Sequence, residues 1–160
     1  SLQIVPPQNI GSLSVLLLHG NLDIWVHGAK NLPNMEIVSL KIPVDPFVCI
    51  CVSNAVIGRT FAIGKSENPV WEQHFYVPVT HHAAEVHFLV KDRDVVGSQI
   101  IGIVAIPVEQ IYSGETVEGT YPILNSNGKP CKPGAVFECI RSVHSNGETY
   151  LLSSRSWSWS

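Results

Sequence analysis

The segment from Asn68 to Val79 limits the fold more strongly than any other part of this sequence. Asn68 and Pro69 predict a turn, because the residue before a proline is pushed out of the helical backbone region. Large apolar side chains then recur at mostly even spacing, which indicates a strand with one buried face and one face toward water. The buried face holds Trp71, Phe75, Val77 and Val79, and the other holds Glu72, His74 and Pro78.

Similar short apolar runs recur along the chain, separated by turns rich in glycine, proline and asparagine. About eight strands and almost no helix signal predict an all-β fold, an antiparallel β-sandwich. The strands are expected around residues 13–18, 22–26, 47–52, 55–62, 71–79, 85–91, 99–107, 120–124 and 135–143. Turns are expected at 19–21 and 80–84, a connection at 33–44, and one helical turn at 108–111.

The chain of 160 residues is long enough for one domain with a real core. We expect an extended leader over residues 1–11, the sandwich over residues 12–144, and a tail over residues 145–160 that is disordered or fits the sandwich poorly.

The composition excludes some classes of function. A formal net charge of −3 argues against nucleic-acid binding, which requires a basic surface. It does not exclude membrane binding, because a bound cation can reverse the local sign. Cys49 and Cys51 lie on the same face of an expected strand and cannot easily bridge each other, which predicts reduced thiols and a cytosolic protein. A Cys-x-Cys zinc half-site is the alternative for this pair.

Three motifs resemble those of C2 domains, the β-sandwiches that bind calcium and phospholipids. The first is Asn68-Pro69-Val70-Trp71 with Phe75. The second starts at Gly20-Asn21-Leu22 and leads through Leu32-Pro33 to Asp45-Pro46-Phe47-Val48. The third is Val90-Lys91-Asp92-Arg93-Asp94, followed by Ile100-Ile101-Gly102. The resemblance covers residues 12–135, is closest to the amino-terminal C2 domain of plant phospholipase D, and implies an eight-stranded Greek-key sandwich.

A calcium site is implied at one end of such a sandwich. Asp92 and Asp94 leave the same face at a strand end, and Asp45 lies on a connection that this fold brings beside them. Calcium takes six to eight oxygen ligands, of which carboxylates are the strongest. Glu36 and Ser98 are expected to complete the ligand set, although the family's first and third loops normally hold further aspartates at such positions.

Two groups of residues are candidates for membrane contact. Apolar side chains on exposed loop tips are expected to enter the membrane interface: Met35, Ile37, Val38, Val95 and Val96. Lys41, Arg59 and Lys65 are expected to meet anionic headgroups. The alternatives are a short strand or buried loop around Ile37, and an ordinary solvated surface for the three cations.

The phospholipase D catalytic motif His-x-Lys-x4-Asp is missing, because no histidine of this sequence is followed two residues later by lysine. We therefore expect a calcium-dependent phospholipid-binding regulatory domain rather than an enzyme, with phosphatidylcholine hydrolysis done by a separate catalytic phospholipase domain. We expect it to be a cytoplasmic monomer that associates peripherally with membranes. The alternative is a calcium-independent module that binds a protein or an inositide.

Overall fold

A computed structural model of the chain describes residues 16–37, 40–42, 44–94, 97–111 and 117–144. Ten strands and one short helix occur in these ranges. The strands are β1 (Leu16–Lys30), β2 (Met35–Ile37), β3 (Leu40–Ile42), β4 (Pro46–Val52), β5 (Ala55–Arg59), β6 (Val70–Ala83), β7 (Glu85–Asp94), β8 (Gly97–Pro107), β9 (Val117–Pro122) and β10 (Val136–His144). The helix is α1 (Val108–Ile111), at the place where one helical turn was expected.

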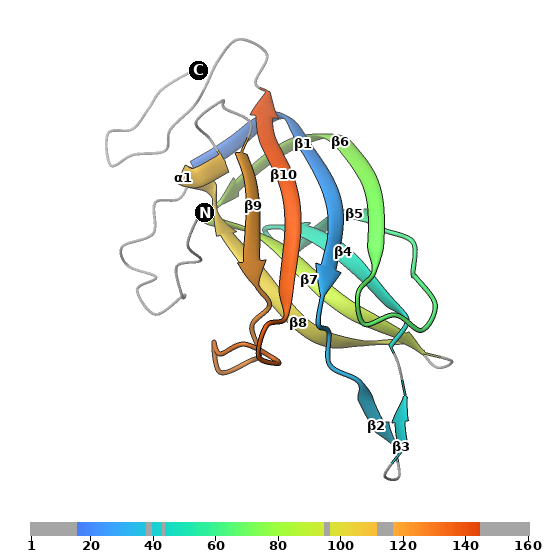
Figure 1. Cartoon of the computed structure of the whole chain (residues 1–160). Helices are drawn as coiled ribbons and strands as arrows, with labels where there is room; N and C mark the ends of the chain where they lie inside the picture. The colour runs from blue at the N-terminus through green and yellow to red at the C-terminus, as the bar shows by residue number, and fades with distance from the viewer. Residues whose placement is uncertain (1–15, 38–39, 43, 95–96, 112–116, 145–160) are drawn as a thin grey trace.

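Two four-stranded antiparallel sheets form a sandwich, which confirms the predicted all-β fold (Figure 1). One sheet has the strand order β6-β1-β10-β9, and the other has the order β5-β4-β7-β8. A separate ribbon of β2 and β3 extends from one end of the sandwich. The main sheets contain eight strands, the number expected for the sandwich, because the segments expected around residues 13–18 and 22–26 both contribute to the single strand β1. The ribbon is additional.

The core lies between the sheets and includes the rings predicted from the sequence. Trp71 is 2% exposed and Phe75 is 9% exposed, both on β6. Phe88 of one sheet packs against Phe137 of the other, with their ring centroids 5.1 Å apart. Fully burying one such ring stabilises a fold by about 2 kcal/mol, so these contacts contribute strongly to holding the layers together.

Directly before β6, the chain lies very close to β1. The backbone N–H of Ala29 donates to the carbonyl of Pro69 at 2.9 Å. A Cβ atom on Gly28 would lie 2.5 Å from that same carbonyl oxygen, so a side chain there would force the strands apart. The indole N–H of Trp71 donates to the carbonyl of Pro46 at 3.3 Å, which ties β6 to the start of β4.

The turn expected at residues 19–21 is wrong, and the turn expected at residues 80–84 is confined to Ala84. β1 continues through residues 19–21, because Gly20 pairs with Val79 within a long antiparallel ladder. β6 continues to Ala83 for the same reason, since it remains paired with β1 as far as Leu16. Local turn propensity is therefore overridden by strand pairing.

The expected connection at residues 33–44 also differs from the structure, because it contains the β2–β3 ribbon. The predicted leader, the start of the sandwich before residue 16 and the predicted tail lie outside the described residues. The domain bounds remain predictions.

Candidate functional site

Two of the predicted calcium ligands meet at one end of the sandwich. Asp92 lies near the end of β7, and Asp45 directly precedes β4, whose first residue pairs with Asp92. The backbone N–H of Asp45 donates to Oδ1 of Asp92 at 2.8 Å. The carbonyl of Asp45 accepts from the N–H of Arg93 at 3.0 Å. The antiparallel pairing of β4 with β7 therefore fixes these two acidic residues beside each other, as the sequence predicted.

The connection between β5 and β6 closes over Asp45. The backbone N–H of Lys65 donates to Oδ1 of Asp45 at 2.7 Å. Lys65 has a φ of 51°, in the left-handed region, at the point where the chain turns toward this carboxylate. The next residue, Ser66, donates its N–H to the carbonyl of Val44 at 3.0 Å. These bonds hold the Asp45 side chain in one place before any ligand arrives.

The chemistry of Asp92 fits a bound cation. Its side chain is buried, with 6% exposure, and lies on the core-facing side of β7. Among the described residues, no lysine, arginine or histidine forms an ion pair with it. A buried carboxylate without a cation is energetically costly, and carboxylate oxygens are the ligands that calcium prefers.

The other predicted ligands are placed less completely. The side chains of Asp94 and Glu36 lie outside the described residues. Ser98 is exposed on β8, where it pairs with Arg93. Within the described ranges, no three histidine, cysteine, aspartate or glutamate side chains gather as a metal site. The described part of the candidate site is therefore the pair Asp45 and Asp92.

A basic hollow of about 510 Å³ lies next to this acidic pair. Arg59 and Arg93 line it together with Phe47, Thr60 and Ser98. The guanidinium of Arg59 lies 5.5 Å from the centroid of the Phe47 ring, a cation–π contact that orients the arginine. The hollow combines two cations with the exposed Ser98 hydroxyl, which is the chemistry that binds phosphate oxygens.

Arg93 was missed by the sequence analysis. Side chains alternate along β7, so that Val90 and Asp92 face the core while Arg93 faces outward. The alternation in Val90-Lys91-Asp92-Arg93 was the available signal, but placing Arg93 and Arg59 in one hollow requires the register of three strands.

The remaining membrane candidates have different outcomes. Lys65 is exposed but does not line the basic hollow. The side chains of Lys41, Met35 and Ile37, and the whole of Val38, Val95 and Val96, lie outside the described residues. The exposed apolar residues that were not predicted as membrane candidates include Phe61 and Ile100. Phe61, at the rim of the hollow, is 53% exposed, and Ile100 on β8 is 64% exposed.

The four cysteines are free thiols. Cys49 is buried on β4. Burial raises the pKa of the Cys51 thiol, and the neighbouring Cys49 raises it further. Among the described residues, no helix is long and apolar enough to span a bilayer.

Comparison with known proteins agrees with this geometry. Residues 20–123 match the C2 domain family. Phospholipase D beta 1 of Arabidopsis thaliana is 65% identical over 144 residues, which cover 78% of this chain and 13% of that protein. Phospholipase D gamma 1 of the same plant is 58% identical over 146 residues, covering 79% of this chain and 17% of that protein. The chain therefore spans less than a fifth of the length of these relatives.

Solved structures share the fold at lower identity. The calcium-bound pair of C2 domains from Extended-Synaptotagmin 2 aligns with a TM-score of 0.65 and 17% identity, covering 80% of this chain and 46% of that one. A C2 domain of plant Extended Synaptotagmin 1 aligns with a TM-score of 0.61 and 21% identity, covering 79% of this chain and 97% of that one. The family match spans most of the sandwich, and this chain belongs to the C2 domain family.

Proposed function

We propose that this C2 domain is a regulatory module that attaches a phospholipase D-type enzyme to anionic membranes in response to calcium. The observation that carries the proposal is the buried Asp92 carboxylate, fixed beside Asp45 and next to the basic hollow. This chain is 65% identical to part of a phospholipase D, which supports a phospholipase D-type enzyme as the protein that the module regulates.

Asp45 and Asp92 are the residues that would hold the calcium ion, with Asp94, Glu36 and Ser98 as further proposed ligands. A bound ion would neutralise the carboxylates and offer a positive centre to lipid phosphate. Asp45 needs little rearrangement for this role, because the backbone N–H of Lys65 already fixes its carboxylate. Preorganisation of this kind lowers the cost of binding.

Arg59 and Arg93 would bind the headgroup phosphate in the basic hollow, with Lys41 and Lys65 adding attraction to the anionic surface. Each cation near such a surface contributes about 1 kcal/mol. Phe61 would rest against the lipid interface at the rim of the hollow. The proposed insertion residues are Met35, Ile37, Val38, Val95 and Val96.

The module itself would be non-catalytic, because the sequence has no histidine followed two residues later by lysine. Hydrolysis of phosphatidylcholine would belong to a catalytic domain beyond this stretch of sequence. The protein would be cytoplasmic and would associate peripherally with membranes as a monomer.

A second function is favoured by one observation. The basic hollow is lined by two arginines that need no metal to bind an anion. A calcium-independent inositide-binding module would rely on this hollow alone, with Asp45 and Asp92 serving only to fix the loops.

Vesicle co-sedimentation with three proteins separates these functions. The wild type, Asp92→Asn and the double variant Arg59→Ala/Arg93→Ala would be mixed with phosphatidylserine vesicles, in calcium and in chelator. The proposal predicts that Asp92→Asn loses only the calcium-dependent part of binding, whereas the double variant weakens binding in both conditions. Full binding by Asp92→Asn in calcium would overturn the calcium-dependent function and favour the second one.

A further inference from the structure

The outer face of the β6-β1-β10-β9 sheet carries a continuous ladder of interacting polar side chains. On β1 and β6, Asp23 contacts His74, whose ring lies 5.5 Å from the ring of Trp25. The indole N–H of Trp25 donates to Oε2 of Glu72 at 2.6 Å. Glu72 also contacts Nδ1 of His27. These contacts position the aromatic and acidic groups of the face.

The ladder continues onto β10. Nε2 of His27 lies 3.5 Å from Oε2 of Glu138. Nζ of Lys30 lies 3.3 Å from the other oxygen of that carboxylate. A histidine is thus held between two glutamates that come from strands on either side of β1.

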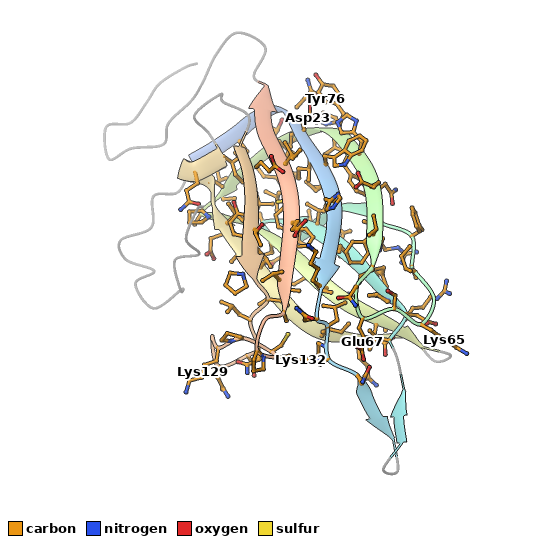
Figure 2. All side chains as sticks on the ribbon, in the orientation of Figure 1. Asp23, Lys65, Glu67, Tyr76, Lys129 and Lys132 are labelled. Carbon is orange, nitrogen blue, oxygen red and sulfur yellow. The ribbon has the colours of Figure 1, made fainter. Side chains whose placement is uncertain are left out.

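The face is strongly acidic. Its described side chains include four carboxylates and one lysine, a formal charge of −3 with the histidines neutral: Asp23, Glu72, Glu118 and Glu138 against Lys30. The whole chain has the same formal charge of −3. Three other lysines lie elsewhere: Figure 2 shows Lys65, Lys129 and Lys132 at the lower end of the molecule, away from Asp23 and Tyr76. An anionic membrane would repel this face, so its complement is a cationic surface.

The face is also unusually apolar for a solvated sheet. Three of the six large hydrophobic side chains that stand exposed among the described residues lie on β1 or β6 here: Trp25 at 38%, Val70 at 56% and Tyr76 at 56%. Exposed aromatic groups are enriched at protein interfaces, in which aromatic and arginine anchors supply most of the binding energy.

A hollow of about 210 Å³ marks the centre of this face. Trp25 and three glutamates line it: Glu72, Glu118 and Glu138. We infer that this sheet face docks an arginine-bearing segment of a partner protein, with one arginine side chain in the hollow beside Trp25. Glu118 is exposed and takes no part in the ion pairs that engage the other two glutamates, so it is the carboxylate placed to accept the guanidinium.

Arginine fits this hollow better than lysine does. Its planar guanidinium stacks on an indole ring and bonds to carboxylates with two parallel N–H groups. A lysine ammonium is a compact, strongly hydrated charge that gains less from the ring and from paired oxygens. The inference goes beyond the proposed membrane function, because it assigns a partner to the sheet that lies away from the acidic pair and basic hollow.

Nuclear magnetic resonance of the ¹⁵N-labelled domain tests the inference, with peptides of eight arginines or eight lysines as probes. The Trp25 indole N–H gives a side-chain signal located at the hollow itself. We expect the arginine peptide to shift this signal, with weaker affinity for the lysine peptide and the same response in calcium and in chelator. Glu118→Gln should lower the affinity of the domain for the arginine peptide about three- to five-fold.

Glu67→Gln is the matched control, because it removes one negative charge from the β5–β6 connection and leaves the sheet face intact. It should leave the affinity unchanged, and unaltered spectra of both free variants would show that they fold. Three results would overturn the inference: a Trp25 signal that does not move, an equal affinity for the two peptides, or full affinity in Glu118→Gln. Because none of these readouts involves lipid, failure here is distinguishable from failure of membrane binding.

Discussion

Replacing Asp92 by asparagine should stabilise the calcium-free domain while removing its calcium response. Asparagine keeps the size of the side chain and an oxygen that accepts the N–H of Asp45, which lies 2.8 Å from Oδ1 of Asp92 in the wild type. The substitution removes the negative charge from a side chain that is only 6% exposed. If the carboxylate of Asp92 serves to bind a metal, the calcium-free wild type should have a lower free energy of unfolding than Asp92→Asn.

The expected size follows from two opposed effects. A hydrogen bond to a charged acceptor is stronger than one to a neutral acceptor by about 1 kcal/mol, and this difference is lost. Removing the negative charge of this buried side chain, which no described cation pairs with, relieves part of a desolvation penalty of several kcal/mol. We expect a net gain of about 1–2 kcal/mol in the free energy of unfolding, or about 4 °C in Tm for a domain of this size.

Thermal unfolding followed by circular dichroism, in chelator and in calcium, measures both effects. At a calcium concentration about 100 times Kd, the wild type should gain about 2.7 kcal/mol and Asp92→Asn should gain almost none. Thr60→Val is the matched control, because its buried Oγ1 accepts the N–H of Val48 on β4 at 2.9 Å, which is likewise a bond from a backbone N–H to a buried side-chain oxygen. That variant should lose about 1–2 kcal/mol in both conditions and keep its calcium response.

Two results would refute the reasoning. A loss of about 2 kcal/mol or more by Asp92→Asn in chelator would show that the charge of Asp92 stabilises the strand end by itself. A calcium shift in Asp92→Asn equal to that of the wild type would show that the ion binds elsewhere.

Three further predictions concern the scaffold. Gly102→Ala should lower the free energy of unfolding by about 1–3 kcal/mol in urea denaturation, since a Cβ there would lie 2.9 Å from the carbonyl oxygen of Leu124; no loss would contradict this close packing. Asn31 has a φ of 58° and donates from Nδ2 to the carbonyl of Gly134 at 2.9 Å. Asn31→Ala and Asn31→Gly both lose this bond, but the alanine variant should be about 1 kcal/mol less stable in urea, and equal stabilities would contradict the left-handed backbone. Because burial raises the pKa of the Cys51 thiol, its alkylation by iodoacetamide, followed by mass spectrometry, should reach half-maximal rate at a higher pH than free cysteine does; a lower midpoint would contradict it.

The parts of the fold that depend on alternating hydrophobicity were predictable from the sequence. Trp71 and Phe75 alternate with polar residues, and both are buried as expected. The turn expected around Gly20 failed because the strand ladder with β6 outweighs the local preference of His19-Gly20-Asn21. Strand pairing is a property of segments that lie far apart in the sequence, and local propensity does not report it.

The candidate site was predictable where it depends on strand ends. The resemblance to C2 domains placed Asp45 and Asp92 together, and β4 pairs with β7 at that point. Arg93 and the Trp25–Glu72 contact were missed for one physical reason: each depends on the register between strands that are distant in sequence. For Trp25 and Glu72 the separation is 47 residues, and a register shift between Val26 and Gly28 lies next to the contact.

The measurement that tests the central claim most directly is co-sedimentation of the wild-type domain with phosphatidylserine and with phosphatidylcholine vesicles. The account predicts binding to phosphatidylserine in calcium, much weaker binding in chelator, and little binding to phosphatidylcholine in either. Equal binding in calcium and in chelator would contradict the calcium-dependent site and leave the basic hollow as the binding element. The absence of binding in all four conditions would contradict membrane attachment altogether.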